Sequence, residues 1–323
     1  MATITALYVY PVKGCAGIKV DKAAVQATGF ALDRNWMVVL EDNGKFRTQR
    51  QLPKLALVQT SLPEAALLGA PSEDAALTLT APGMSALQVP LTPPTGLPPR
   101  LIDCTCWEWS GKACDEGEVP AEWFTQYLGK PCRLVRFAGK PKPPGAASKA
   151  DVDATRRLTE EEFAPSHEVA FPDGFPFLIA SEESLEDLNK RLKQPLKMNR
   201  FRPNIVVRGT GPWSEDAWAS LHIGSADRGV DFDSVKPCSR CKVTTIDQET
   251  AEVGDEPLKA LQAFRSGEVL EYWHQKEFTH KQHSKAVHFG WNLVPRQEGE
   301  VAVGDALQVL AARPGVGSNA AAA

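Results

Sequence analysis

Apolar and polar residues alternate along most of the first hundred positions, which is the period of a β-strand with one buried face. Two β-prone runs flank Asn43 and Gly44, a pair favoured in type I′ turns, so residues 36–49 are predicted to form a hairpin. Short strands at this spacing indicate a barrel or sandwich and not a βαβ fold. The other alternating runs are 3–14, 18–27, 55–62, 76–83 and 86–91.

The pattern changes to helical spacing after residue 118. Trp123, Phe124 and Tyr127 recur as on one face of a helix, and Gly129 can close it, so 119–130 is predicted to be helical. Residues 132–137 return to a strand pattern.

The stretch 138–157 is rich in Pro, Lys, Ala and Gly, which is typical of an exposed linker or loop. It is the predicted domain boundary, and a chain of 323 residues is long enough for two domains. We therefore expect one domain over 1–145, a second over 146–312, and a disordered tail over 313–323.

The second half mixes strand and helix patterns. Residues 176–194 look like a buried strand that runs into a helix, with Ser181 as N-cap and acidic residues in the first helical turn. A short helix is predicted over 256–265. Strand patterns cover 204–209, 220–224, 230–235, 242–247, 288–296 and 299–310. The chain is thus predicted to be α+β and mostly β, with two β-rich domains and a few helices.

Composition narrows the function classes. The formal net charge of −4 argues against a chain-wide nucleic-acid footprint. No apolar run approaches the ~20 residues that span a bilayer, and residues 1–14 lack the basic start and apolar block of a signal peptide. We therefore expect a cytoplasmic protein with no membrane partner. In that reducing compartment the seven scattered cysteines should be thiols unless they carry chemistry.

Cys238 and Cys241 stand at C-x-x-C spacing with Arg240 between them. A zinc site needs two more ligands, which Cys104 and Cys106 or the histidines at 274–288 would have to supply. A redox dithiol should open a helix, whereas 242–247 has a strand pattern.

Two interpretations of the cysteine pair remain. Both thiols can be ordinary buried side chains. Alternatively, one thiolate holds a soft or multivalent transition metal, and the neighbouring guanidinium attracts an anionic cofactor.

Polar residues also gather at predicted strand and loop ends, where barrels bind ligands. Taken singly, each is explained by a surface charge, a turn, or an ion pair such as that of Arg34 with Asp33. Their joint occurrence at strand ends favours a binding site. The residues are Lys13, Gly14, Arg34, Asp173, Gly174, Arg202 and Asn204.

Seven stretches closely resemble, in order, the MOSC-domain proteins of the amidoxime-reducing component type. The resemblance extends over residues 2–312, and "FRPN" and "PCSRC" are its most specific motifs. The stretches are "YPVKG" (10–14), "LDRNWMVV" (32–39), "FPFLIASEESLEDLN" (175–189), "FRPNIVV" (201–207), "PCSRCKVTTID" (237–247), "PLKALQAFR" (257–265) and "FGWNLV" (289–294).

The resemblance implies an N-terminal MOSC-type β-barrel domain followed by a MOSC β-barrel domain. It also implies a molybdenum cofactor, which is a molybdopterin with a terminal phosphate, and it makes Cys241 the catalytic thiolate ligand of the metal. Gly14, Gly174 and Phe175 replace more polar residues of relatives, so backbone N–H groups would serve there. The implied cofactor contacts are Lys13, Gly14, Arg34, Asp173, Gly174, Phe175, Arg202, Asn204, Ser239 and Arg240.

The implied reaction is the two-electron reduction of small N-hydroxylated substrates, amidoximes and hydroxylamines, with oxygen passing from nitrogen to molybdenum. No cysteine cluster of a ferredoxin-like domain follows, so a separate iron–sulfur, flavin or haem protein is the expected electron donor, and a monomer is expected. Two alternatives stay open. One is a sulfur carrier with a persulfide on cysteine, and the other is a carrier or storage protein for the cofactor or for zinc.

Overall fold

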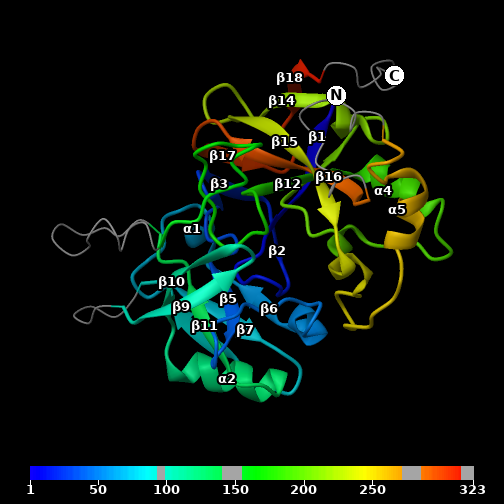
Figure 1. Cartoon of the computed structure of the whole chain (residues 1–323). Helices are drawn as coiled ribbons and strands as arrows, with labels where there is room; N and C mark the ends of the chain where they lie inside the picture. Colours follow the sequence, from blue (N-terminus) through cyan, green and yellow to red (C-terminus); the bar gives the residue numbers. More distant parts are fainter. Residues whose placement is uncertain (93–98, 140–154, 271–284, 314–323) are drawn as a thin grey trace. The chain divides into compact units, whose positions relative to one another are not determined.

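The computed structural model describes residues 1–92, 99–139, 155–270 and 285–313 (Figure 1). The chain divides into two compact units, and neither is one continuous segment. The first unit contains residues 1–8, 19–27 and 177–323, and the second contains residues 9–18 and 28–176. The predicted boundary between 145 and 146 lies outside the described residues, as does the predicted tail beyond residue 313.

The first unit is built on an eight-stranded sheet in the order β18-β14-β15-β16-β12-β13-β1-β2. Two strands, β12 (Phe177–Ser181) and β13 (Ile205–Arg208), are parallel, while β13 pairs antiparallel with β1 and β12 with β16. All five residues of β12 are buried, which is typical of a strand covered on both faces. The other strands of this sheet are β1 (Thr3–Val9), β2 (Ile18–Val20), β14 (Trp218–Ile223), β15 (Val230–Arg240), β16 (Val287–Pro295) and β18 (Leu307–Ala312).

Two α-helices of the first unit pack around an aromatic cluster. Helix α4 (Glu182–Asn189) begins as predicted, because the Ser181 side chain accepts a hydrogen bond from the Ser184 N–H at 3.3 Å. Helix α5 (Leu258–Phe264) confirms the second predicted helix. The rings of Phe201 and Phe289 stack at 3.8 Å between centroids. The cluster is completed by Ala180, Leu188, Leu261 and Val287.

The strand predicted over 242–247 is wrong, since η4 (Lys242–Thr245) is a 3₁₀ turn. The Thr244 hydroxyl donates to the Cys241 carbonyl at 3.0 Å, and the Thr245 hydroxyl donates to the Lys242 carbonyl at 2.9 Å. Threonine hydroxyls that bond the backbone locally compete with strand pairing, and here they prevail over β-propensity. The first unit also contains η2 (Met198–Arg200), η3 (Ser214–Ala217), and the antiparallel pair β3 (Lys22–Gln26) and β17 (Gly299–Ala302).

The second unit contains a four-stranded sheet, β5-β11-β10-β9, and a three-stranded sheet, β6-β7-β8. Helix α2 (Glu118–Leu128) confirms the predicted helix, and Gly129 caps it in the left-handed conformation at φ 70°. The remaining elements are β4 (Gly29–Phe30), β5 (Trp36–Leu40), η1 (Pro53–Leu57), β6 (Gln59–Ser61), α1 (Glu64–Leu67), β7 (Ala76–Thr80), β8 (Leu87–Pro90), β9 (Leu101–Cys106), β10 (Trp109–Asp115) and β11 (Cys132–Arg136).

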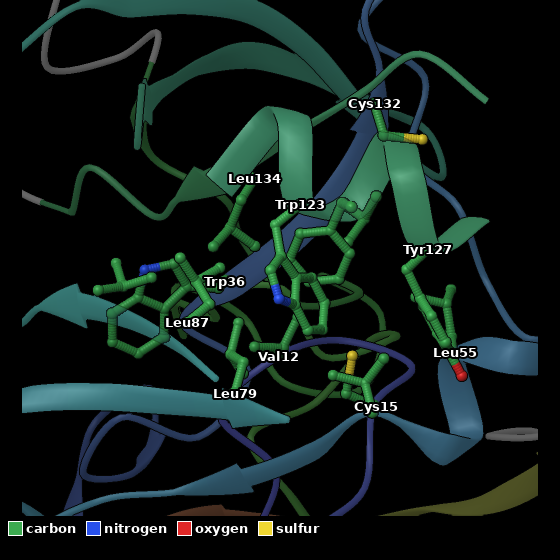
Figure 2. Close-up of a cluster of buried hydrophobic side chains, with 14 of the residues drawn as sticks. Val12, Cys15, Trp36, Leu55, Leu79, Leu87, Trp123, Tyr127, Cys132 and Leu134 are labelled. Atoms are coloured by element: carbon green, nitrogen blue, oxygen red, sulfur yellow. The ribbon is translucent and has the colours of Figure 1, made fainter. Parts of the chain in front are cut away.

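Figure 2 shows the main hydrophobic cluster of the second unit, where Trp123 and Tyr127 of α2 face Trp36, Leu79 and Leu134 from three strands. The predicted hairpin over 36–49 is present in part. Gly44 adopts φ 64° in the turn, but the second arm pairs with β5 only through a single bridge, Val39 to Phe46.

The described residues are mostly β with four α-helices, which agrees with the predicted class. None of those helices has both the length and the apolar character to cross a membrane.

Candidate functional site

Cys241 is the last residue before η4, and its side chain is half-buried. Its carbonyl oxygen accepts from both the backbone N–H and the hydroxyl of Thr244, at 3.1 and 3.0 Å. Arg200 donates to the Thr244 carbonyl at 2.9 Å. The backbone that carries the thiol is therefore fixed by Thr244 and Arg200, while Cys241 as a residue is only partly buried.

Arg240 links the cysteine motif to the "FRPN" loop. Its Nη1 donates to the sulfur of Cys238 at 2.8 Å, and its Nη2 donates to the Phe201 carbonyl at 2.7 Å. The guanidinium also lies 5.6 Å from the centre of the Phe201 ring. Ser239, which is exposed, pairs across the sheet with His288, which is fully buried.

The "FRPN" loop holds its arginine in a rare conformation. Arg202 has φ 56°, is 8% exposed, and donates through Nη1 to the side-chain oxygen of Gln248 at 3.3 Å. A non-glycine residue at positive φ is strained, and such strain gathers at functional sites. The adjacent Asn204 is fully buried. Its amide accepts from the Leu178 N–H and donates to the Tyr8 carbonyl, both at 3.2 Å, so it joins β12 to β1.

The second unit gathers the other predicted residues. The Lys13 side chain is 5% exposed, donates to the Phe171 carbonyl at 2.8 Å, and forms an ion pair with Asp173. The indole N–H of Trp107 donates to the same carboxylate at 3.1 Å. Lys13 also lies over the rings of Phe46 and Trp107, at 5.6 and 5.8 Å from their centres.

One carboxylate and one guanidinium of the second unit have shifted pKa values, because each lies beside an opposite charge. Partial desolvation opposes ionisation of Asp173, but the charge and hydrogen bond of Lys13, the Trp107 N–H and Arg34 outweigh it, so the pKa of Asp173 lies well below its usual range. Burial also opposes the charge on Arg34. Its ion pair with Asp33, at 2.5 Å, and the charges of Tyr10 and Asp173 prevail and raise the pKa of Arg34.

Three predicted site residues, Gly14, Gly174 and Phe175, have no polar side chain. Gly14 has φ 87°, and its carbonyl accepts from the Gln49 side chain at 2.7 Å. Phe175 is 5% exposed and packs on Phe163, so its ring is part of the core. An added Cβ on Gly174 would lie 3.1 Å from a carboxylate oxygen of Glu160.

The remaining cysteines do not form a metal site in the described part of the chain, where no cluster of three or more His, Cys, Asp or Glu side chains is found. Cys104 and Cys106 lie in β9, and both are buried. Burial, with the nearby Cys106 and Asp103, raises the pKa of Cys104 to about 12, so this thiol stays protonated. The predicted histidines 274, 280 and 283 lie outside the described residues.

The predicted residues therefore form two groups, each inside its own unit. Lys13, Arg34 and the Asp173 turn are together in the second unit, and the "FRPN" and C-x-x-C loops are together in the first. Sequence reasoning missed Trp107 and Arg157. Arg157 donates to the backbone carbonyl of Asp173 but stands in a charged stretch that looks like solvated surface.

The family models divide the chain at another place, because the Asp173 turn falls within the MOSC match while Lys13 and Arg34 fall within the N-terminal match. The MOSC N-terminal beta barrel domain matches residues 1–131, and the MOSC domain matches residues 166–308. Mitochondrial amidoxime-reducing component 1 of Mus musculus is 33% identical over 317 residues, which cover 96% of this chain and 83% of that protein. The component 1 of Homo sapiens is 33% identical over 316 residues, with the same coverage. The component 2 of Rattus norvegicus is 36% identical over 271 residues, covering 82% and 73%.

The chain belongs to the MOSC-domain family of the amidoxime-reducing components. This confirms the resemblance carried by the "FRPN" and "PCSRC" motifs, and it confirms the fold as an N-terminal MOSC β-barrel domain followed by a MOSC domain. Relatives at about one-third identity support a MOSC-family reductase. The individual residue assignments stay predictions.

Proposed function

We propose that this MOSC protein is a molybdenum-cofactor-dependent reductase of N-hydroxylated compounds, amidoximes and hydroxylamines, and that Cys241 is its ligand to the metal. The observation that carries the proposal is the partly buried Cys241 on a loop whose backbone is fixed by Thr244 and Arg200. The names of the relatives support the substrate class.

The donor groups suit such a cofactor. A thiolate is a soft ligand that favours transition metals of this kind. Arg202, Arg240, Lys13 and Arg34 are cations of the type that binds phosphate. Within the described residues the Nε–H of Arg240 is buried and has no acceptor, although the other two nitrogens of that guanidinium are engaged. A buried donor of this kind favours a bound acceptor.

Seven of the predicted residues then receive a role. In the first unit, Cys241 anchors the metal, Arg202 neutralises anionic charge, and Arg240 and Ser239 bind beside the thiolate. In the second unit, Lys13 is the cation proposed to neutralise anionic charge. Asp173 is held ionised, and a carboxylate repels phosphate. We therefore assign Asp173 to the ring N–H groups of the pterin, since a carboxylate accepts such donors. Asn204 acts by joining the strands that carry the loop.

The bound cofactor supplies two electrons, so that an N–O bond is broken, two protons are taken up, and water leaves with an amidine or amine. The protein contributes binding, orientation and charge. A separate redox protein is proposed as the electron donor. The cytoplasmic location and monomeric state expected from the sequence stay predictions, and the relatives are named as mitochondrial proteins.

Production in a host that makes the molybdenum cofactor tests the proposal. Molybdenum and pterin are measured per chain, and benzamidoxime reduction is followed with an artificial electron donor. We expect about one molybdenum per chain and turnover in the wild type, and no turnover in Cys241→Ala. Cys114→Ala, at a half-buried cysteine of β10, is the control and should stay active. Zinc alone, or no metal with a sulfur released by cyanide, would contradict the proposal.

A further inference from the structure

Four successive carbonyl oxygens in the loop that leads to Asp173 accept hydrogen bonds from buried cations. Arg157 donates through Nη1 to the carbonyls of residues 170 and 172 at 3.1 and 2.5 Å, and through Nη2 to that of residue 173 at 2.6 Å. Lys13 donates to the carbonyl between them, that of Phe171, at 2.8 Å. The backbone over 170–173 is thus fixed at every residue by two side chains.

Arg157 is an unusual buried charge. Arg157 is 5% exposed, and among the described residues no carboxylate forms an ion pair with its guanidinium. Buried arginines are normally neutralised by an acidic partner. By comparison, Arg133 of the same unit is equally buried and bonds Asp115, Glu118 and Glu41. The guanidinium of Arg157 therefore donates its hydrogen bonds to backbone carbonyls and holds the backbone of this loop in place.

The same loop also has backbone N–H groups that can donate hydrogen bonds. Among the described residues, the backbone N–H groups of Asp173, Gly174 and Phe175 have no acceptor. The preceding N–H, that of Phe171, is bonded to the Arg34 carbonyl at 3.0 Å. Arg157 and Lys13 thus engage the carbonyl side of this loop, and the N–H groups of residues 173–175 remain available to another partner. Backbone N–H groups without an acceptor can donate to a bound anion or another hydrogen-bond acceptor.

We infer that Arg157 is a positioning residue for cofactor binding, an inference that rests on the proposed function. It fixes the backbone of 170–173 so that the N–H groups of Asp173, Gly174 and Phe175 present themselves as donors to the pterin. Gly174 has no side chain and the ring of Phe175 carries no hydrogen-bonding group. The backbone N–H groups therefore supply the hydrogen-bond donors that more polar side chains would otherwise provide.

The first test is hydrogen exchange on the full-length protein without cofactor. Arg157→Met removes the charge and the donors at similar length, and Arg157→Lys keeps the charge but cannot span three carbonyls. We expect the Phe171 amide to exchange at least tenfold faster in both variants, while the amides of β11 keep their wild-type rates. Arg313→Lys is the matched control, because Arg313 is also buried and donates to two carbonyls, those of Trp218 and Ser234.

Unchanged exchange at Phe171 in Arg157→Met, or an equal rise at Phe171 and β11, would overturn the inference. Restoration of wild-type exchange by Arg157→Lys would also overturn it, because charge alone would then suffice. Should Arg157→Met fail to fold, Arg157→Gln takes its place in the comparison. Glutamine also removes the charge, and its amide can still donate to one carbonyl, which supports folding.

The second test is pterin content per folded chain after production with limiting cofactor. Both Arg157 variants should fall at least fivefold, and Arg313→Lys should stay within twofold of the wild type. Full pterin content in Arg157→Met would refute the positioning role. If the wild type itself holds no pterin, the proposed function fails, and the exchange test alone then decides how Arg157 acts on the loop.

Discussion

The buried carboxyl of Glu215 predicts an unusual dependence of stability on pH. Glu215 lies in η3, is fully buried, and accepts a hydrogen bond from the Ser184 hydroxyl at 2.9 Å. Its neighbour Asp216 accepts from both Nη atoms of Arg265, at 2.6 and 2.9 Å, and from the indole of Trp291 at 2.8 Å. Burial, followed by the charge of Asp216, raises the pKa of Glu215 to about 7.

The size and sign of the effect follow from proton linkage. Between its ordinary pKa of 4.5 and about 7, the folded state retains a proton that the unfolded state has released. The free energy of unfolding therefore falls as pH rises through this window. The raised pKa corresponds to about 3 kcal/mol, because one pKa unit is about 1.4 kcal/mol.

Urea unfolding of wild type and Glu215→Gln at pH 5, 6, 7 and 8 measures this contribution. The amide cannot ionise, so the variant should be more stable than the wild type by up to about 3 kcal/mol at pH 8 and nearly equal at pH 5. Glu122→Gln, at an exposed position of α2, should show no such trend. A difference between Glu215→Gln and wild type that does not change with pH would refute the reasoning.

Three further predictions concern the core and the site. Leu79→Ala, in the cluster of Figure 2, should lower the free energy of unfolding in urea by about 2–5 kcal/mol, and a loss below about 1 kcal/mol would contradict the packing described. Arg240→Lys keeps its charge but cannot reach both the Cys238 sulfur and the Phe201 carbonyl, so molybdenum content should fall at least threefold; wild-type content would exclude a bridging role. Because the pKa of Asp173 is lowered, its ion pair with Lys13 should persist as pH falls below 3.8, the ordinary pKa of aspartate, and pterin retention on gel filtration should be the same at pH 5 and pH 3; release near pH 3.8 would speak against the pair.

Local signals in the sequence predicted the local elements. The Ser181 cap and the Gly129 terminus act on residues only a few positions away, so the ends of helices α4 and α2 can be predicted from local sequence. The 3₁₀ turn after Cys241 was not, because β-propensity over 242–247 is overridden by threonine hydroxyls that bond backbone carbonyls. The discontinuous units were also missed, since strand pairs such as β1 with β13 join residues about two hundred positions apart.

For the candidate site, the sequence identifies candidate residues but not the role of each. Motif resemblance singled out the residues of both loops, but it could not separate a ligand contact from a support. Asn204 is predicted to contact the cofactor, and that stays a prediction; its amide also bonds Leu178 and Tyr8, a supporting role that the motif does not reveal. Arg157 and Trp107 gave no signal, because an arginine in a charged stretch and a tryptophan near a turn are most simply surface and core. Only the folded backbone shows that both converge on Asp173.

X-ray absorption at the molybdenum edge tests the central claim most directly. The account predicts that the wild-type metal has one more sulfur neighbour than the metal in Cys241→Ser, and that Cys238→Ser keeps the wild-type count. An equal sulfur count in wild type and Cys241→Ser, with molybdenum present in both, would contradict the claim that Cys241 binds the metal.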